Sequence, residues 1–258
     1  MKSYVIFSCD HQLYGINIDY VLRILSSQNL TLMSGEEEHI EGMFMYEEEI
    51  LKVVSLRHLL GKKSYALQLQ EFFPELKGQH QDWIDALVDC VDKNVPFTKT
   101  TDPHACHLGK WIDSFHPDNT KIVETMKHLT YHHEQLHHSA LDVLDLRDES
   151  QEKAHAWIEN NVQDICKTTL SYLDDIQKLS SEVAVDMQQC LVLLDKEGNN
   201  FGLNIDKVEE IVHVEESELH VSKDRQAMGE FMDIEAILSV NGKLVSILHE
   251  MMPFKNSE

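Results

Sequence analysis

Four side chains from three separate stretches of the chain have the chemistry of metal ligands. His133 and His137 are four residues apart, so on a helix they would lie on one face, one turn from each other. His80 belongs to an apolar helical face of its own, and Cys106 lies near the predicted start of another helix, where the helix dipole favours the thiolate. Three neutral imidazoles and one thiolate suit a tetrahedral zinc ion. The spacing therefore predicts a zinc site if these helices pack as one bundle.

Other interpretations of these side chains stay open. A single histidine on an apolar helix face is also typical of a core residue that is held by a hydrogen bond. His104 and His107 flank Cys106 and are further candidate ligands, although helical geometry turns them off the ligand face. A zinc ion that only staples the bundle would use the same four ligands, so a purely structural module is one alternative.

Residues 133–137 read HEQLH, which satisfies the H-E-x-x-H pattern of zinc proteases. In that chemistry Glu134 would act as the general base on a zinc-bound water. A catalytic zinc needs three protein ligands and an open position. Asp145 and Glu149 are the downstream candidates for the third ligand, and neither is at a convincing position. A fourth ligand such as Cys106 would close the coordination shell, so we expect no enzyme; a zinc-dependent hydrolase is the second alternative.

The middle of the chain has the helical periodicity that these ligands require. Apolar residues recur at helical spacing in four stretches: 80–91, 102–115, 121–143 and 150–179. Four amphipathic helices with short connections are typical of a bundle. We therefore expect a four-helix bundle at residues 63–184. Its first part, residues 63–78, has no predicted element beyond a linker.

The two ends of the chain carry the same phrase. Residues 14–25 read YGINIDYVLRIL and residues 201–212 read FGLNIDKVEEIV, with six of twelve positions identical. Each phrase follows a short apolar run and a turn, as in a β-hairpin, and each has a glycine inside its strand. A second similarity, between VVSLRHLL at 53–60 and LVSILHEM at 244–251, extends the repeat to a whole small β-module.

Composition excludes several classes of protein. The net charge of −23 and the lack of a Lys/Arg cluster exclude nucleic-acid binding. No apolar run reaches membrane-spanning length, and the start MKSYVIFSCD turns polar too soon for a secretory signal. Five scattered cysteines fit a reducing compartment. We therefore expect a cytoplasmic protein without membrane insertion.

The repeated ends resemble CheW, the coupling protein of bacterial chemotaxis arrays. The resemblance is carried by the stretch from Gly42 to Arg57 and by GNNFGLNIDKVEEIV at 198–212, and it covers residues 3–61 and 186–253. It implies an α+β chain in which a tandem of two small β-barrels is interrupted by the helical insert. It also implies two kinds of partner, a chemoreceptor and a histidine kinase.

The domain boundaries follow from this resemblance. Residues 1–62 would form the first barrel, residues 63–184 the insert, and residues 185–258 the second barrel. The family carries an Arg-Gly pair and a following Pro where this chain has Glu47, Glu48 and Lys52. The local charge is thereby reversed, and charge complementarity selects partners. The resemblance leaves open whether the partner is an ordinary array protein or a divergent one.

The insert resembles the chemoreceptor zinc-binding domain, CZB, over residues 72–180. Its motifs occur in the family's order: His80-x-x-Trp83, Cys106-x-Leu108-Gly109-x-Trp111 and His133-x-x-x-His137. By this resemblance the zinc ligands are His80, Cys106, His133 and His137. CZB domains are associated with zinc-linked sensing and with oxidants such as hypochlorous acid. The resemblance implies a non-enzymatic, zinc-binding adaptor in which Cys106 is the redox-sensing ligand.

Overall fold

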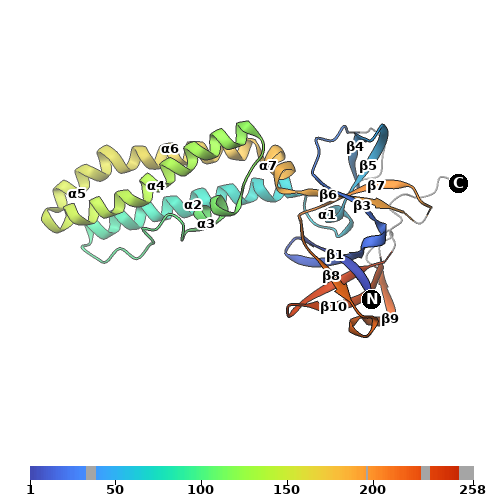
Figure 1. The fold of residues 1–258 in the computed structure, drawn as a ribbon. Coiled ribbons are helices and arrows are strands. Elements are labelled where there is room, and N and C mark those ends of the chain that lie inside the picture. Colours follow the sequence, from blue (N-terminus) through green and yellow to red (C-terminus); the bar gives the residue numbers. More distant parts are fainter. Residues whose placement is uncertain (33–38, 196, 228–232, 250–258) are drawn as a thin grey trace. The chain divides into compact units, whose positions relative to one another are not determined.

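In the computed structural model the chain forms two compact units. The structure describes residues 1–32, 39–195, 197–227 and 233–249. One unit combines Met1–Tyr65 with Val185–Glu258, and the other is Ala66–Ala184. The first unit is built mainly from strands and the second from helices (Figure 1). The predicted α+β class, with a helical segment inserted into β-structure, is confirmed.

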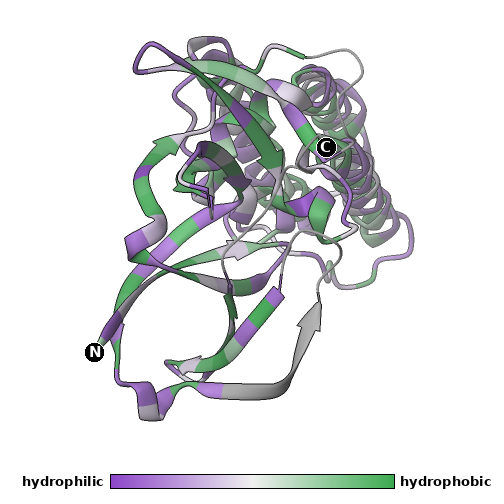
Figure 2. Cartoon of the chain, turned by 90° about the vertical axis from the view of Figure 1, so that its right-hand side faces the viewer, coloured by the Kyte–Doolittle hydropathy of each residue, from purple (hydrophilic) through white to green (hydrophobic). Residues whose placement is uncertain are grey.

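The first unit contains two antiparallel-rich sheets. Its strands are β1 (Lys2–Cys9), β2 (Gln12–Asn17), β3 (Val21–Ser26), β4 (Ile40–Tyr46), β5 (Glu49–Ser55), β6 (Gln189–Leu194), β7 (Asn200–Ile205), β8 (Lys207–Val214), β9 (His220–Ala227), β10 (Asp233–Val240) and β11 (Lys243–Leu248). One sheet has the order β8-β1-β2-β11-β10-β9 and the other β3-β6-β7-β5-β4. Hydrophobic and hydrophilic residues mix along the strands, as expected for sheets with one covered face (Figure 2).

Each sheet takes strands from both ends of the chain, which corrects the prediction that residues 1–62 and 185–258 each form a barrel of their own. β1 and β2 lie in a sheet with β8–β11, whereas β3–β5 lie with β6 and β7. The exchange of strands between the two ends of the chain is symmetric. β2 lies between β1 and β11, and β7 lies in the same way between β6 and β5. Among the described strands no pairing closes either sheet into a barrel.

The glycine of each repeated phrase lies where a neighbouring strand comes close. Gly15 is opposite Ile247 in β11, and Gly202 is opposite Val53 in β5. A Cβ atom would come within 2.7 Å of a side-chain atom of Ile247 in the first case and 3.0 Å of Val53 in the second. Val53 and Ile247 are therefore equivalent. The sequence similarity matches Val53 to Leu244 instead, so the register that it predicts is wrong by three residues.

The acidic stretch after β4 is a two-residue hairpin turn. Glu47 and Glu48 have φ values of 45° and 72°, and Asn241 and Gly242 form the equivalent turn with 51° and 78°. Such turns need positive φ at both positions and favour Asn-Gly. Glutamate at this place is strained, which gives a backbone reason for the family's glycine. The other acidic run, Glu36–Glu38, lies outside the described residues.

A buried ion pair joins elements that follow different strands of the first unit. Arg57 lies in α1 (Leu56–Leu59), the short helix after β5. The Arg57 side chain is 3% exposed. Its Nε and Nη2 atoms donate to the two carboxylate oxygens of Asp206 at 2.7 and 2.6 Å. Asp206 also accepts the backbone N–H of Asp10, in the turn between β1 and β2, at 2.8 Å. This pair ties a turn of one sheet to the end of a strand in the other.

The second unit is helical, as predicted, but it contains more than the four predicted helices, because short helices accompany the long ones. The helices are α2 (Tyr65–Asp92), α3 (His107–Ser114), α4 (Thr120–Glu149), α5 (Gln151–Trp157), α6 (Gln163–Lys178) and α7 (Ser180–Met187), with a π-helical turn at Ile158–Val162. α2, α4 and α6 run lengthwise beside each other, and the short α3 lies against them (Figure 1). Their buried faces form a core around Leu87, Leu136 and Ile158.

Helix α2 begins well before the predicted helix, so most of residues 63–78 is helical rather than a linker. The helix continues through Pro74, which has no N–H to donate to the carbonyl of Gln70. The side-chain Nε2 of Gln177 on α6 donates to that carbonyl instead, at 3.3 Å. A neighbouring helix thus offsets part of the cost of proline, and this compensation could not be seen in the local sequence.

Candidate metal centre

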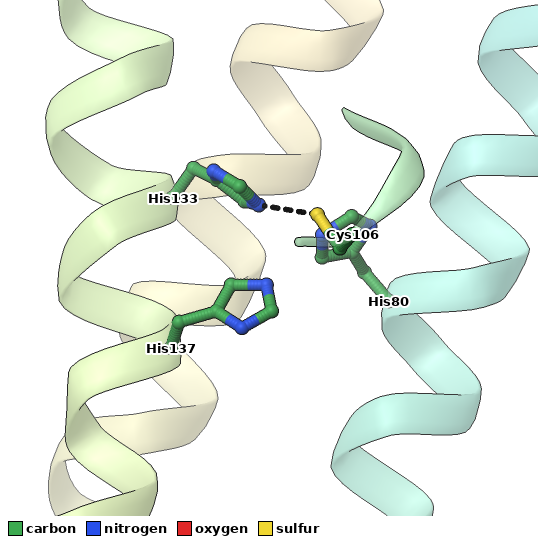
Figure 3. A group of neighbouring side chains, drawn as sticks. All are labelled: His80, Cys106, His133 and His137. Atoms are coloured by element: carbon green, nitrogen blue, oxygen red, sulfur yellow. Dashed lines mark hydrogen bonds between the residues drawn. The ribbon is translucent and has the colours of Figure 1, made fainter. Parts of the chain in front are cut away.

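The four predicted ligands meet inside the bundle. One ligand atom each from His80, Cys106, His133 and His137 lies within 4.8 Å of the other three (Figure 3). His80 comes from α2, Cys106 from the residue before α3, and the two other histidines from successive turns of α4. The three histidines are at most 3% exposed, and Cys106 is half-buried. Four residues from three elements therefore point at one place.

Cys106 is placed by a tight turn rather than by a helix. It is the N-cap of α3, and its Sγ accepts the backbone N–H of Gly109 at 3.2 Å. The stretch 102–115, which has helical spacing in the sequence, becomes helical only from His107. A turn precedes α3, and the Asp102 side chain accepts the N–H of His104 at 2.9 Å. A Cβ atom at Gly109 would lie 1.8 Å from the carbonyl oxygen of Pro103. Only glycine lets this turn fold against α3 and aim the sulfur inward.

Backbone carbonyls set the tautomers of two histidines. Nδ1 of His80 lies 2.7 Å from the carbonyl oxygen of Leu76, and Nδ1 of His137 lies 3.1 Å from that of Thr100. A carbonyl only accepts, so each Nδ1 carries the proton and each Nε2 offers a lone pair. Both Nε2 atoms are buried without a hydrogen-bond partner among the described residues. Nε2 of His133 lies 3.2 Å from Sγ of Cys106.

These orphan lone pairs fit a bound cation. A buried acceptor without a partner costs free energy, and a metal ion among the four donors would satisfy it. A ligand histidine that donates its other N–H to a carbonyl is also the usual arrangement around zinc. The donor set of three imidazoles and one thiol is that of a closed, tetrahedral site. The residues present therefore suit zinc.

Burial keeps the histidines neutral and the thiol protonated. It lowers the pKa of His133 to about 2, with help from the neighbouring imidazoles, and the pKa of His137 to about 4. It also lowers the pKa of His80 and raises the pKa of the Cys106 thiol. Neutral imidazole is the form that binds a metal, whereas the thiol must first lose its proton. Metal binding at this site would release one proton from sulfur.

The alternative site residues do not join this group. His104 is exposed, and its Nδ1 lies 3.0 Å from the carboxylate of Asp113. Nδ1 of His107 lies 3.1 Å from Nε2 of Gln79. Glu134, the base of the protease hypothesis, is not among the described residues whose ligand atoms converge. Asp145 and Glu149, the candidate third ligands of that hypothesis, are not in the group either. Glu149 pairs with Lys153 instead.

Two features of the site are not predicted from the sequence. The first is the backbone of Thr100, whose carbonyl accepts from both His137 and the indole of Trp83. The second is a cavity of about 340 Å³ beside the centre, which is lined by His80, Cys106 and His137 and rimmed by polar side chains that include Lys99. No sequence signal marks a carbonyl acceptor, because every residue has one.

Two family models match the chain. The model of the CheW-like domain matches residues 3–73, and the model of the chemoreceptor zinc-binding domain matches residues 80–144. The second match begins at His80 and includes all four converging residues. These matches define the class: the chain carries a CheW-like domain and a chemoreceptor zinc-binding domain, as the resemblance implied.

A solved structure is similar to the whole chain at low identity. It is the crystal structure of the scaffolding protein TtCheW from Thermoanaerobacter tengcongensis, with 12% identity over 99% of this chain and 94% of that one, and a TM-score of 0.48. A likeness at this level carries no functional inference. No curated protein sequence matches the chain. Within the described residues no helix is long and apolar enough to cross a membrane.

Proposed function

We propose that this chain is a cytoplasmic, non-catalytic adaptor in chemotaxis-type signalling, with zinc held by His80, Cys106, His133 and His137. The convergence of four ligand atoms within 4.8 Å, from three elements, is the observation that supports it. The match to a chemoreceptor zinc-binding domain over the same residues gives the class of metal site. The CheW-like domain gives the class of signalling system.

The chain's own residues would prepare the site for the ion. The carbonyls of Leu76 and Thr100 hold two imidazoles with Nε2 facing inward. The N–H of Gly109 points at Sγ of Cys106 and stabilises negative charge on it. A bound zinc ion supplies the positive charge that keeps this sulfur as thiolate. With four protein ligands no position is left for a reactive water.

Cys106 is the ligand through which the site would respond to oxidants. It is the only oxidisable member of the set, it is half-buried rather than buried, and it lines the cavity beside the centre. With hypochlorous acid, the sulfur takes the chlorine, the O–Cl bond breaks and hydroxide leaves. Water then displaces chloride from sulfur, which gives a sulfenic acid and releases a proton. A sulfenic acid is a weaker ligand than a thiolate, so oxidation would loosen the site.

The output would pass through the two connections of the insert. The second unit is Ala66–Ala184, and the chain enters it from the first unit and returns to the first unit. A rearrangement of the ligand-bearing helices would therefore act on both connections. The partners we propose are a chemoreceptor and a histidine kinase of a chemotaxis-type array. The acidic turn at Glu47 and Glu48 would favour a basic surface on such a partner.

Metal analysis of the purified full chain tests this function. We expect one zinc per chain in the wild type, and much less in Cys106→Ala and in His133→Ala. His138→Ala, at an exposed histidine on the same helix, should keep the metal. A wild type without zinc would refute the site.

Two further assays separate the remaining alternatives. Zinc-dependent peptide cleavage that is lost in Glu134→Gln would overturn the non-catalytic proposal. Receptor and kinase binding should differ between zinc-bound, zinc-free and oxidised protein. Equal binding in all three states would leave the zinc purely structural.

A further inference from the structure

Trp83 donates its indole N–H to the carbonyl that orients His137. Nε1 of Trp83 lies 2.8 Å from the carbonyl oxygen of Thr100, and Nδ1 of His137 lies 3.1 Å from the same atom. The Trp83 side chain is 4% exposed, and its ring centroid lies 5.1 Å from that of His137. One carbonyl therefore joins a tryptophan of α2 to a candidate ligand of α4.

Thr100 lies in residues 93–106, the connection between α2 and α3, which belongs to neither helix. The position of its carbonyl depends on what holds this connection. Trp83 holds it twice, through the hydrogen bond to Thr100 and through an edge-to-face contact with Phe97 at 5.4 Å between ring centroids. The same connection ends at Cys106, another of the four converging residues. A rigid helix thus fixes an irregular segment at the point where that segment meets the site.

We propose that Trp83 is a positioning residue for the metal centre. Its N–H holds the Thr100 carbonyl in the place where that carbonyl keeps the proton of His137 on Nδ1, so that Nε2 is presented to the ion. This inference rests on the proposed zinc site. Loss of an outer-shell partner of a ligand histidine typically weakens metal binding about 10- to 100-fold. Trp83 acts one step further out, so we expect the lower end, about tenfold.

Trp111 provides a matched control in the same bundle. It is 9% exposed, and its Nε1 is buried with no hydrogen-bond partner among the described residues. Its ring packs edge-to-face on Phe73 at 5.3 Å between centroids. Trp83→Phe and Trp111→Phe both keep an aromatic ring and both remove an indole N–H. Only the first removes an N–H that orients a ligand.

The test is metal titration of the full chain with Zn²⁺ and with Co²⁺, whose visible spectrum reports ligand geometry. We expect Trp83→Phe to raise the Kd about tenfold and to alter the Co²⁺ spectrum, while Trp111→Phe behaves as the wild type. Melting of the metal-free proteins is measured in parallel. A role in packing alone would lower the melting temperature of Trp83→Phe and leave its Kd unchanged.

Two results would overturn the proposal. One is a Kd for Trp83→Phe within twofold of the wild type. The other is an equal loss in Trp83→Phe and Trp111→Phe. If Trp83→Phe does not fold, benzothienylalanine at position 83 keeps the bicyclic shape, replaces the N–H by sulfur, and should show the same loss. Failure of the wild type to bind either metal would refute the zinc site itself, and this inference with it.

Discussion

Acid should destabilise the metal-free bundle, because the folded bundle buries histidines in their neutral form. Burial lowers the pKa of His133 to about 2 and that of His137 to about 4. In the unfolded chain the same rings take up a proton near pH 6.5. Below that pH the unfolded state binds more protons than the folded state, so the free energy of unfolding falls as the pH falls. Above pH 6.5 the contribution of these histidines is fully present.

The size of this effect follows from the two pKa values. Each histidine loses about 1.4 kcal/mol for each pH unit below 6.5, until its folded pKa is reached. At pH 5 this amounts to about 2 kcal/mol for each of His133 and His137, or about 4 kcal/mol together. The lowered pKa of His80 acts in the same direction. Domains are typically stable by about 5–15 kcal/mol, so this loss is large.

Urea unfolding of the chelator-treated full chain, followed by the helical circular dichroism signal, measures this loss. We expect little change in the free energy of unfolding from pH 8 to 7, and a fall of at least about 4 kcal/mol from pH 7 to 5. His133→Gln should lose about 2 kcal/mol of this dependence, whereas His138→Gln, at an exposed position of the same helix, should keep it. Equal pH dependence in the wild type and His133→Gln would refute the reasoning.

Three substitutions and one control substitution test other parts of the structure. Glu48→Gly relieves the strain of a positive φ in the hairpin turn and should raise the free energy of unfolding of the first unit by about 1 kcal/mol in urea titrations. A decrease would contradict the turn assignment. Gly109→Ala places a Cβ atom 1.8 Å from the Pro103 carbonyl, so it should lower the melting temperature and the zinc content together. Gly78→Ala, in a helix with nothing within 4 Å, is its control and should be neutral or stabilising. Arg57→Met leaves the Asp206 carboxylate without its buried partner and should cost about 3–5 kcal/mol by the same titration, and a loss below 1 kcal/mol would show that the pair is dispensable.

The sequence predicted the two repeated hairpins of the first unit but not the strands that lie beside them. A repeated phrase with an apolar run and a turn indicates a hairpin wherever it occurs. It does not say which third strand lies beside that hairpin, because the two copies are alike. In the structure β11 lies beside β2, where Gly15 accommodates Ile247, and β5 lies beside β7, where Gly202 accommodates Val53. The strands next to the glycines come from the opposite ends of the chain, which no local pattern records.

The convergence of the four side chains could be predicted where side-chain type and helical spacing carry the information. An imidazole pair four residues apart on α4 must share a face, and the motif order placed Cys106 and His80 opposite it. The orientation of the imidazoles of His80 and His137 could not be predicted in this way. It depends on the carbonyls of Leu76 and Thr100, and because every residue has a carbonyl, no residue type marks these two.

The two carbonyls also differ in how far they could have been inferred. Leu76 is four residues before His80, so its carbonyl lies on the same helix and within reach of Nδ1 by helical geometry alone. Thr100 is outside any helix and far from His137 in sequence, so only the folded connection brings it there. Its position needs an anchor that the helix does not provide. The indole of Trp83 is the group that holds this carbonyl, so this buried tryptophan bears on the candidate metal centre through the backbone of Thr100.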